Sequence, residues 1–505
     1  MNEQPRQSPA QSMVTFYHDI EQNLDSDADV SQCRRMVEEF LNIERDHKIS
    51  VTYNVVGKIF EQQPDLIEKI QKAGQEVAFH SYQHYSDWRP RYYAEEIKLC
   101  RQVADQPAGY RSPQSRWNRK TLKTLYENGF LWNAEADPQQ EPYFVYKGLV
   151  RLPIFDDDWP LHTHKMNCAQ WVDRYKQSLH KRSYLAFGSH DFVTAEDPQQ
   201  RLKAWAKVIE TALNHGSVVA TFSETADLFR RAACAKYYSD VSQDWNRDTQ
   251  TLYRTKRFRE MIRTAAEKLD RPVVADLGSG GGSLTCQLHD LAEKIYCIDN
   301  APGMVALANS HNGVEGRLGE ATNSNLPDKS CDLVICARVI EYLFWPDRLA
   351  DEIRRIGKPG ATYFVTFPVR QQKAPLNEGA PPDRIRRHYT PEQIKKWAEL
   401  IGPGSLIGIQ YDPAEPENPA QEQAYRRQEE NPPQKILPTN WVYMGTIGSQ
   451  PAPLPHRHLP LDAFEFRFPL LCQPDPWAVI KKIKRRIFRI ARKLLLPGKT
   501  KSLLI

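Results

Sequence analysis

The first 232 residues alternate between short apolar runs and longer amphipathic stretches. Apolar runs with the length of buried strands occur at Val14–Phe16, Val51–Val56, Glu76–His80, Phe130–Asn133, Tyr184–Phe187 and Val218–Phe222. Apolar residues at helical spacing mark the stretches Cys33–Arg45, Pro64–Lys72 and Leu202–Leu213. Strands that alternate with helices predict a mostly parallel α/β sheet, which is either open or closed into a barrel.

A second α/β pattern begins at residue 273, after a predicted helical stretch from Tyr237 to Leu269. Its strands are predicted at Val273–Leu277, Lys294–Ile298, Asp332–Cys336, Thr362–Phe367, Leu406–Gln410 and Val442–Thr446. Six prolines between residues 413 and 438 predict a long polar loop between the last two strands. Because 505 residues exceed what one hydrophobic core supports, two α/β domains are expected.

The composition is that of an ordinary globular protein. Hydrophobic residues make up 40% of the chain and charged residues 26%, and no apolar run approaches the roughly 20 residues of a membrane-spanning helix. The nine cysteines include no C-x-x-C pair, which favours a reducing compartment. Residues 1–12 are polar and lack the apolar segment of a secretory signal, so we expect a disordered N-terminus and a cytoplasmic protein.

Positive charge is concentrated at the end of the chain. From Trp477 onward there are ten Lys or Arg and no Asp or Glu, so the formal charge of +5 leaves −5 for the preceding residues. This balance argues against nucleic-acid binding by the body of the protein. Apolar positions 480, 483, 487, 490, 491 and 494 form a helical stripe opposite a basic face. We expect a basic amphipathic helix that either docks onto the protein or lies on an anionic membrane surface, at the inner face of the membrane.

Polar residues with catalytic chemistry follow several predicted strands of the N-terminal half. They occur in the segments VTFYHDIEQ, FHSYQH, GYRSP and LAFGSHDF. Active sites of parallel α/β folds form at the carboxyl ends of strands, so we expect these side chains to meet. Two histidines at i and i+4 with one carboxylate can bind a divalent metal, and a second carboxylate and a third histidine could supply a general base and a general acid. The candidates are Asp19, Glu21, His80, His84, Arg111 and His190.

These motifs, together with the stretch VTYNVVGKIFEQQPDLIEKIQKAGQEVAFHSYQH, resemble the polysaccharide deacetylase family with the NodB homology domain. The resemblance covers residues 13–232 and implies a distorted (β/α) barrel. It also implies that His80 and His84 bind a divalent metal of the Zn, Co or Ni type. Arg111 matches the arginine that orients the catalytic carboxylate, and His190 matches the histidine that protonates the leaving amine.

Two further positions bear on this resemblance. Either Asp156 or Asp158, in FDDDW, matches an Asp-Trp motif that lines the pocket. The family's adjacent aspartates, a base followed by a metal ligand, are replaced here by Asp19-Ile-Glu21. We assign Asp19 as the base and Glu21 as the third metal ligand, and the exchanged assignment is the alternative. A barrel that only binds glycan is the alternative to a catalytic one.

A glycine-rich loop follows the first strand of the second half. In VVADLGSGGGS, Asp276 is followed by Gly278, Gly280 and Gly282, which allow a ligand to approach the backbone closely. A dinucleotide-binding G-x-G-x-x-G motif would require glycine at position 283, where serine stands. Asp299, at the end of the next strand, is placed to accept both hydroxyls of a ribose.

The continuation resembles class I S-adenosylmethionine-dependent methyltransferases through GEATNSNLPDKSCDLVICARVIEYL and EIRRIGKPGATYFVTFP. The resemblance implies that Asp276, the three glycines and Asp299 bind S-adenosylmethionine, with Glu320 and Ala321 beside the adenine. Asn431-Pro-Pro-Gln434 is similar to an amino-methyltransferase motif, but it lies in the Pro-rich stretch and is interpreted as loop. The methyl acceptor stays open, and Arg338, Glu341 and Tyr342 are the expected pocket residues.

The predicted fold class is therefore α/β, a NodB-like distorted (β/α) barrel followed by a doubly wound, Rossmann-like methyltransferase domain and a C-terminal basic amphipathic helix. The expected divisions are residues 1–12, 13–232, 233–270 as a helical connector, 271–448, and 449–505 as Pro-rich linker and helix. The predicted function is N-deacetylation of an acetylated sugar on a lipid- or nucleotide-linked glycan, with methyl transfer to the same or a related substrate. The alternatives are a methyltransferase with a glycan-binding barrel and an antibiotic-type tailoring enzyme for small molecules.

Overall fold

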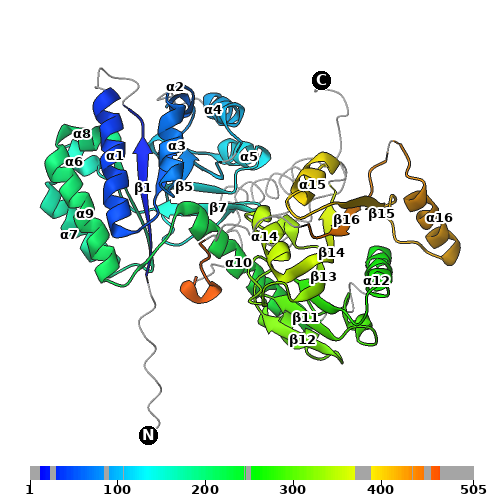
Figure 1. Ribbon diagram of the computed structural model, residues 1–505. Helices are drawn as coiled ribbons and strands as arrows, with labels where there is room; N and C mark the ends of the chain where they lie inside the picture. Colours follow the sequence, from blue (N-terminus) through cyan, green and yellow to red (C-terminus); the bar gives the residue numbers. More distant parts are fainter. Residues whose placement is uncertain are drawn as a thin grey trace, which may run out of the picture.

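The computed structural model describes residues 12–22, 30–84, 90–105, 107–243, 245, 252–369, 388–434, 436–448 and 457–466. Two mostly parallel sheets, each with its own helices, form two lobes (Figure 1). The predicted basic helix beyond Trp477 lies outside the described residues. Within the described ranges, no helix combines the length and the apolar character needed to cross a membrane.

The first lobe is a distorted barrel, as predicted. Its strands are β1 (Met13–Ile20), β2 (Thr52–Val55), β3 (Glu76–Phe79), β4 (Gly109–Arg111), β5 (Trp132–Ala136), β6 (Tyr143–Tyr146), β7 (Leu149–Ile154), β8 (Tyr184–His190) and β9 (Val218–Val219). They are hydrogen-bonded in the order β6-β7-β5-β4-β3-β2-β1-β8, with β9 beside β1. The ring closes where Phe155 donates to Ala186 at 3.0 Å and Asp156 accepts from Gly188 at 3.1 Å. All pairs on this path are parallel except β6–β7.

Helices cover the outside of the barrel. They are α1 (Val30–His47), α2 (Gly57–Gln62), α3 (Pro64–Lys72), α4 (Pro90–Val103), η1 (Pro113–Ser115), α5 (Arg119–Glu127), α6 (Trp159–His162), α7 (Cys168–Leu179), α8 (Asp191–Glu196) and α9 (Pro198–Asn214). The apolar faces of α1, α2, α3, α6, α7 and α9 share one core with the outer face of the strands, which includes Phe16, Phe40 and Trp205. The apolar faces of α4 and α5 pack in a second cluster around Phe79. Burying such large apolar side chains is the main stabilising contribution to the barrel.

The second lobe has the strand order of a doubly wound sheet. Its strands are β10 (Val273–Leu277), β11 (Lys294–Asp299), β12 (Val314–Leu318), β13 (Cys331–Cys336), β14 (Gly357–Pro368), β15 (Gly404–Ile409) and β16 (Asn440–Thr446). They run β12-β11-β10-β13-β14-β16-β15, and only the pairs that involve β16 are antiparallel. The order reverses between β10 and β13, so a crevice for a ligand is expected at the carboxyl ends of these strands.

Helices and short turns of the second lobe complete its two outer layers. They are α12 (Tyr253–Ala266), η2 (Cys286–Leu288), α13 (Pro302–Ala308), η3 (Ile340–Tyr342), α14 (Pro346–Ile356), α15 (Pro391–Ala398) and α16 (Pro419–Glu430), with η5 (Leu461–Ala463) further along the chain. The prediction of a polar loop between β15 and β16 is wrong over the length of α16. Asn418 caps this helix by accepting from the amides of residues 420 and 421, and Pro419 occupies the first turn.

One helix links the two lobes. α10 (Phe222–Asp240) begins shortly after β9, where the apolar pattern predicts a strand that continues to Phe222. Thr221 and Glu224 form a capping box at its start, which favours helix over strand there. The helix runs through the expected domain boundary after residue 232 and lies between the two sheets (Figure 1).

Candidate active sites

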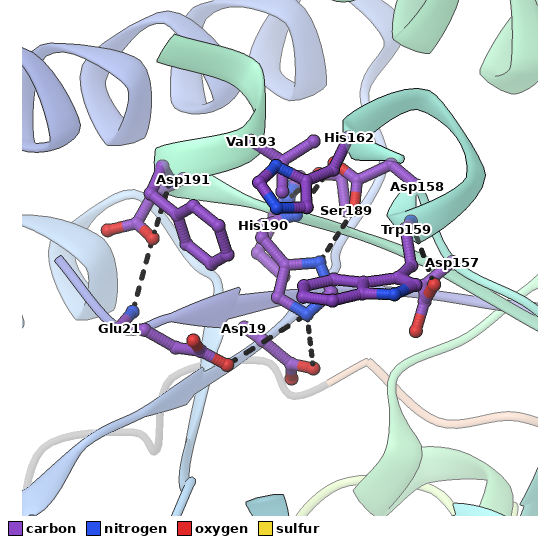
Figure 2. A network of polar contacts seen from close by, with 12 residues as sticks. Asp19, Glu21, Asp157, Asp158, Trp159, His162, Ser189, His190, Asp191 and Val193 are labelled. Atoms are coloured by element: carbon purple, nitrogen blue, oxygen red, sulfur yellow. Dashed lines mark hydrogen bonds and ion pairs between the residues drawn. The ribbon is translucent and has the colours of Figure 1, made fainter. Parts of the chain in front are cut away.

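The end of β1 directs two carboxylates into the mouth of the barrel. Side chains alternate along a strand, so Asp19 and Glu21 share one side, while His18 faces the helices and contacts Glu44 at 2.7 Å. Asp191 accepts hydrogen bonds from the backbone amides of Glu21 at 3.2 Å and of Gln22 (Figure 2). The chain direction after β1 is therefore fixed by the element that follows β8.

Glu21, His80 and His84 form one cluster. Nε2 of His80 lies 3.0 Å from Oε1 of Glu21, and Nε2 of His84 lies 3.1 Å from the same oxygen. The three ligand atoms lie within 4.8 Å of one another. Nδ1 of His80 donates to the carbonyl of Arg111 at 3.2 Å, which fixes the ring with Nε2 toward the cluster. Two imidazoles and one carboxylate are a donor set that suits Zn²⁺ or a similar divalent ion with open positions.

The electrostatics of Glu21 favour its charged form. Burial alone would raise its pKa, but hydrogen bonds from His80 and His84 hold the pKa of this carboxyl well below its usual range. The site is thus built around an anion that faces two nitrogen ligands, and a divalent cation would satisfy all three groups.

Asp19 is held by two neighbours on the floor of the site. Nε of Arg111 donates to its Oδ2 at 2.7 Å, and Nδ2 of Asn54 donates to its Oδ1 at 2.9 Å. Burial raises the pKa of Asp19, but the positive charges of Arg111, His80 and His190 together outweigh burial and hold the pKa below its ordinary value. Sequence reasoning did not single out Asn54, although an amide in the apolar strand TYNV is a signal for a polar contact.

His190 closes the other side of the site. Its Nδ1 lies 2.6 Å from Oδ1 of Asp158, and its backbone amide donates to Oδ2 of Asp158 at 3.0 Å. Its Nε2 lies 3.6 Å from Oδ2 of Asp19 and 3.9 Å from Oε1 of Glu21, on the side of the ring away from Asp158 (Figure 2). Although burial lowers the pKa of His190, the Asp158 carboxylate raises it well above its usual value. The raised pKa favours the protonated form of this imidazole.

The aspartates of the FDDDW segment face different partners. Asp158 contacts His190, whereas Asp156 faces Arg174 at 2.7 Å, so the geometry favours Asp158 among the two candidates. The ring of Trp159 lies 6.3 Å from that of His190 and is 48% exposed. Figure 2 shows the indole of Trp159 beside the imidazole of His190.

The glycine-rich loop of the second lobe has a backbone conformation that favours glycine at three positions. Gly278 has a φ of +70°, and a Cβ there would lie 2.3 Å from the side chain of Val339. Gly280 and Gly282 also have positive φ values. Asp276 is buried below this loop and accepts from the hydroxyl of Thr285 at 3.0 Å, and burial raises its pKa to about 7. The positive φ values and the close approach of Val339 explain why this loop requires glycine.

Asp299 and Glu320 lie at the ends of neighbouring strands. The amide of Gly280 donates to Oδ2 of Asp299 at 2.8 Å, so the loop and the predicted ribose-binding carboxylate are joined. Glu320 follows β12 and is 8% exposed, as is Ala321. Its Oε1 faces Arg231, and its Oε2 is buried without a hydrogen-bond partner in the part of the chain that the structure describes. A buried carboxylate oxygen without a donor fits an amino group of a ligand.

The expected acceptor residues also lie together. Nε of Arg338 donates to Oε1 of the buried Glu341 at 2.9 Å, and the hydroxyls of Tyr238 and Tyr342 are 3.1 Å apart. Tyr238 belongs to α10 and was not predicted, because only the folded chain brings this helix to η3. Residues 431–434, by contrast, follow α16 and are separated in sequence from the end of β13, as predicted for a loop.

Comparisons with known proteins agree with this division. The polysaccharide deacetylase family model matches residues 20–131, and the methyltransferase domain model matches residues 275–365. The biotin biosynthesis bifunctional protein BioHC of Cellvibrio japonicus is 29% identical over 101 residues, which are 20% of each chain. The trans-aconitate 2-methyltransferase of Streptomyces coelicolor is 30% identical over 26% of this chain and 43% of its own length.

Among solved structures, a putative polysaccharide deacetylase from Mycobacterium smegmatis is 22% identical, with a TM-score of 0.37 over 45% of this chain and 91% of that one. The chain spans only a fifth of the length of BioHC and less than half of the trans-aconitate methyltransferase. The two family matches fall on the two lobes and include both candidate sites in part. The protein thus carries a polysaccharide deacetylase domain followed by a methyltransferase domain.

Proposed function

We propose that the barrel removes the acetyl group from an N-acetylated sugar in a metal-dependent reaction. The observation that carries this proposal is the arrangement around one mouth of the barrel. The cluster of Glu21, His80 and His84 lies beside the Asp19–Arg111 pair and the His190–Asp158 pair. Each group needed for amide hydrolysis is therefore within reach of one acetamide.

The residues of this chain would divide the work as follows. Glu21, His80 and His84 would hold a divalent ion, which would supply Lewis-acid chemistry to the acetamide carbonyl and to water. Asp19, kept anionic by Arg111, accepts a proton from the attacking water. His190 delivers the proton on Nε2 to the departing amine, while Asp158 retains Nδ1. The acyl C–N bond breaks, and acetate and a free amine leave.

We propose that the second lobe transfers a methyl group from S-adenosylmethionine. Asp276, the loop glycines and Asp299 would hold the cofactor, with its adenine against Glu320 and Ala321. S-adenosylmethionine would supply the methyl group at its sulfonium. Arg338, Glu341 and Tyr342 border the expected acceptor position and orient the acceptor atom for in-line attack.

We further propose a lipid- or nucleotide-linked glycan as the substrate of both reactions, either on one molecule or on related ones. The sequence beyond Trp477 supports this, because a basic amphipathic segment favours an anionic membrane surface. On this proposal the enzyme is cytoplasmic, with a peripheral position on the inner face of the membrane.

One experiment tests both activities. Purified full-length protein is incubated with labelled S-adenosylmethionine and a panel of N-acetylated sugar donors, and both acetate release and methyl incorporation are measured. His80→Ala should abolish acetate release alone, and Asp276→Ala should abolish methyl incorporation alone. Acetate release that survives both His80→Ala and exhaustive chelation would contradict a metal-dependent barrel.

A further inference from the structure

Helix α10 is shared by the two lobes. Its first residue, Phe222, is buried in the barrel, with its ring 5.5 Å from that of Tyr17 and 5.0 Å from that of Trp132. Near its other end, Ser239 accepts a hydrogen bond from the amide of Gly303 in α13 at 2.8 Å. A single helix of 19 residues is therefore anchored in the barrel at one end and in the methyltransferase lobe at the other (Figure 1).

Arg231, in the middle of this helix, connects three parts of the chain. Its Nε donates to Asp227 on the same helix at 2.7 Å, and its Nη2 donates to the carbonyl of Leu459 at 2.9 Å. Its Nη1 donates to Oε1 of Glu320. The arginine side chain is only 12% exposed, so these contacts are shielded from water and depend on close packing.

Glu320 is held from two sides through one oxygen. Arg231 and Nε2 of His458, the latter at 3.2 Å, both face Oε1. The second oxygen, Oε2, is buried and accepts no hydrogen bond from any residue that the structure describes. Leaving such an oxygen without a donor costs free energy, so the arrangement favours a ligand that donates there. Because Arg231 and His458 both contact Oε1, Oε2 is the oxygen left for that ligand.

We infer that Arg231 and His458 are positioning residues for the cofactor, which hold Glu320 so that its Oε2 accepts from the 6-amino group of the adenine. This inference rests on the proposed methyltransferase function and deepens it. Recognition of the cofactor then depends on a helix that the barrel itself anchors. His458 belongs to a segment whose Phe466 packs against Phe229 of α10, with ring centres 5.2 Å apart, so this segment is part of the same junction.

The test compares two ligands that differ at the adenine position. Calorimetry on the full-length protein would measure the affinity of S-adenosylhomocysteine and of S-inosylhomocysteine, in which an oxo group replaces the 6-amino group. We expect the wild type to prefer the amino form by at least about tenfold, since a hydrogen bond to a buried charged oxygen is lost in the oxo form. In Arg231→Ala this preference should fall to about threefold or less, with Arg231→Lys between the two.

Lys236→Ala is the matched control, because Lys236 lies on the same helix, is 59% exposed and pairs with Asp240 one turn further along. It should keep the wild-type preference. His458→Ala, outside the helix, should reduce the preference and serves as the second variant if Arg231→Ala does not fold. An unchanged preference in both Arg231→Ala and His458→Ala would overturn the inference. A wild type that binds neither ligand would instead overturn the proposed methyltransferase function.

Discussion

Asp158 contacts His190 twice, through its ring and through its backbone amide, at 2.6 and 3.0 Å. The carboxylate therefore fixes the direction of the imidazole as well as its charge. Nε2 is left to face Asp19 and Glu21 across the mouth of the barrel. On the proposed mechanism, the general acid would be the His190–Asp158 pair rather than a single histidine.

Removal of the Asp158 charge should shift the pH dependence of deacetylation. Burial lowers the pKa of His190 in the folded protein, but the carboxylates of Asp158, Glu21 and Asp19 together raise it above its usual value. The proton is therefore lost only as the pH rises through that elevated value. In Asp158→Asn the pKa falls, and the alkaline limb of the pH–rate profile should move to lower pH. We expect a rate loss of about 10²-fold at neutral pH. Asp156→Asn, in the same loop but facing Arg174, should keep the wild-type profile; an equal shift in both variants would refute the assignment.

Substitutions of Glu21 and Asp19 should have different effects, one on metal binding and the other on turnover. Glu21→Gln replaces a charged ligand with a neutral one. Even residues that only hydrogen-bond to metal ligands contribute about 10- to 100-fold to metal affinity, so the affinity for the metal should fall by that much or more. Asp19→Asn should retain the metal and slow turnover by about 10²- to 10⁴-fold, because the water loses its base. Metal content and acetate release distinguish the two. The reverse pattern would mean that the two roles are exchanged.

Asp276→Ala should abolish binding of S-adenosylmethionine while deacetylation persists. The residue lies under the glycine loop and holds Thr285, whereas the residues of the barrel site belong to the other sheet. Calorimetry with S-adenosylhomocysteine measures the loss, and acetate release measures the retained activity. Asp290→Ala, an exposed aspartate that pairs with Arg263, is the control and should bind normally. Wild-type affinity in Asp276→Ala would argue against this cofactor site.

Two glycines with similar backbone angles should respond differently to alanine. Gly360 has a φ of +82°, and a Cβ at this position would meet no described atom within 4 Å, so Gly360→Ala should cost about 1–2 kcal/mol of unfolding free energy from strain alone. Gly278→Ala adds a clash with Val339 and should cost about 1–3 kcal/mol more. Urea denaturation measures both. Equal losses of unfolding free energy would show that the Gly278 loop rearranges to accommodate the added methyl group at no further cost.

Removal of residues 477–505 should release the protein from anionic membranes. The expectation comes from the sequence, in which this segment contains ten basic residues and an apolar stripe at helical spacing. Flotation with liposomes of phosphatidylglycerol and phosphatidylcholine, at low and high salt, measures the effect. If the truncated protein floats as well as the full chain does, the segment has another role.

The sequence was most informative where residues act close to their own strand. His80 and His84 follow β3, and Asp19 and Glu21 end β1, so the barrel topology alone brings them to one mouth. The edge strand β6 and its partner β7 were missed, because Arg151 and Pro153 interrupt the apolar pattern of β7. Helix α16 was missed because its polar composition and the surrounding prolines favoured a loop, although Asn418 and Pro419 are start signals.

Other parts of the sites had no signal along the chain. Arg231 lies 89 positions from Glu320, and no sequence motif around either residue indicates that the two are in contact. Tyr238 likewise reaches Tyr342 only because α10 continues past the barrel. Such pairings are set by how the two lobes pack, and a periodic pattern in one segment contains no information about them.

The continuity of α10 restricts how the protein can be dissected. A cut after residue 232 divides the helix within one turn of Arg231 and leaves Glu320 in a fragment without its arginine. Separately produced halves would therefore need overlapping ends, each with residues 222–240. A chimera that exchanges one domain for a homologue would have to inherit this helix and the loop of Glu320 as a matched pair.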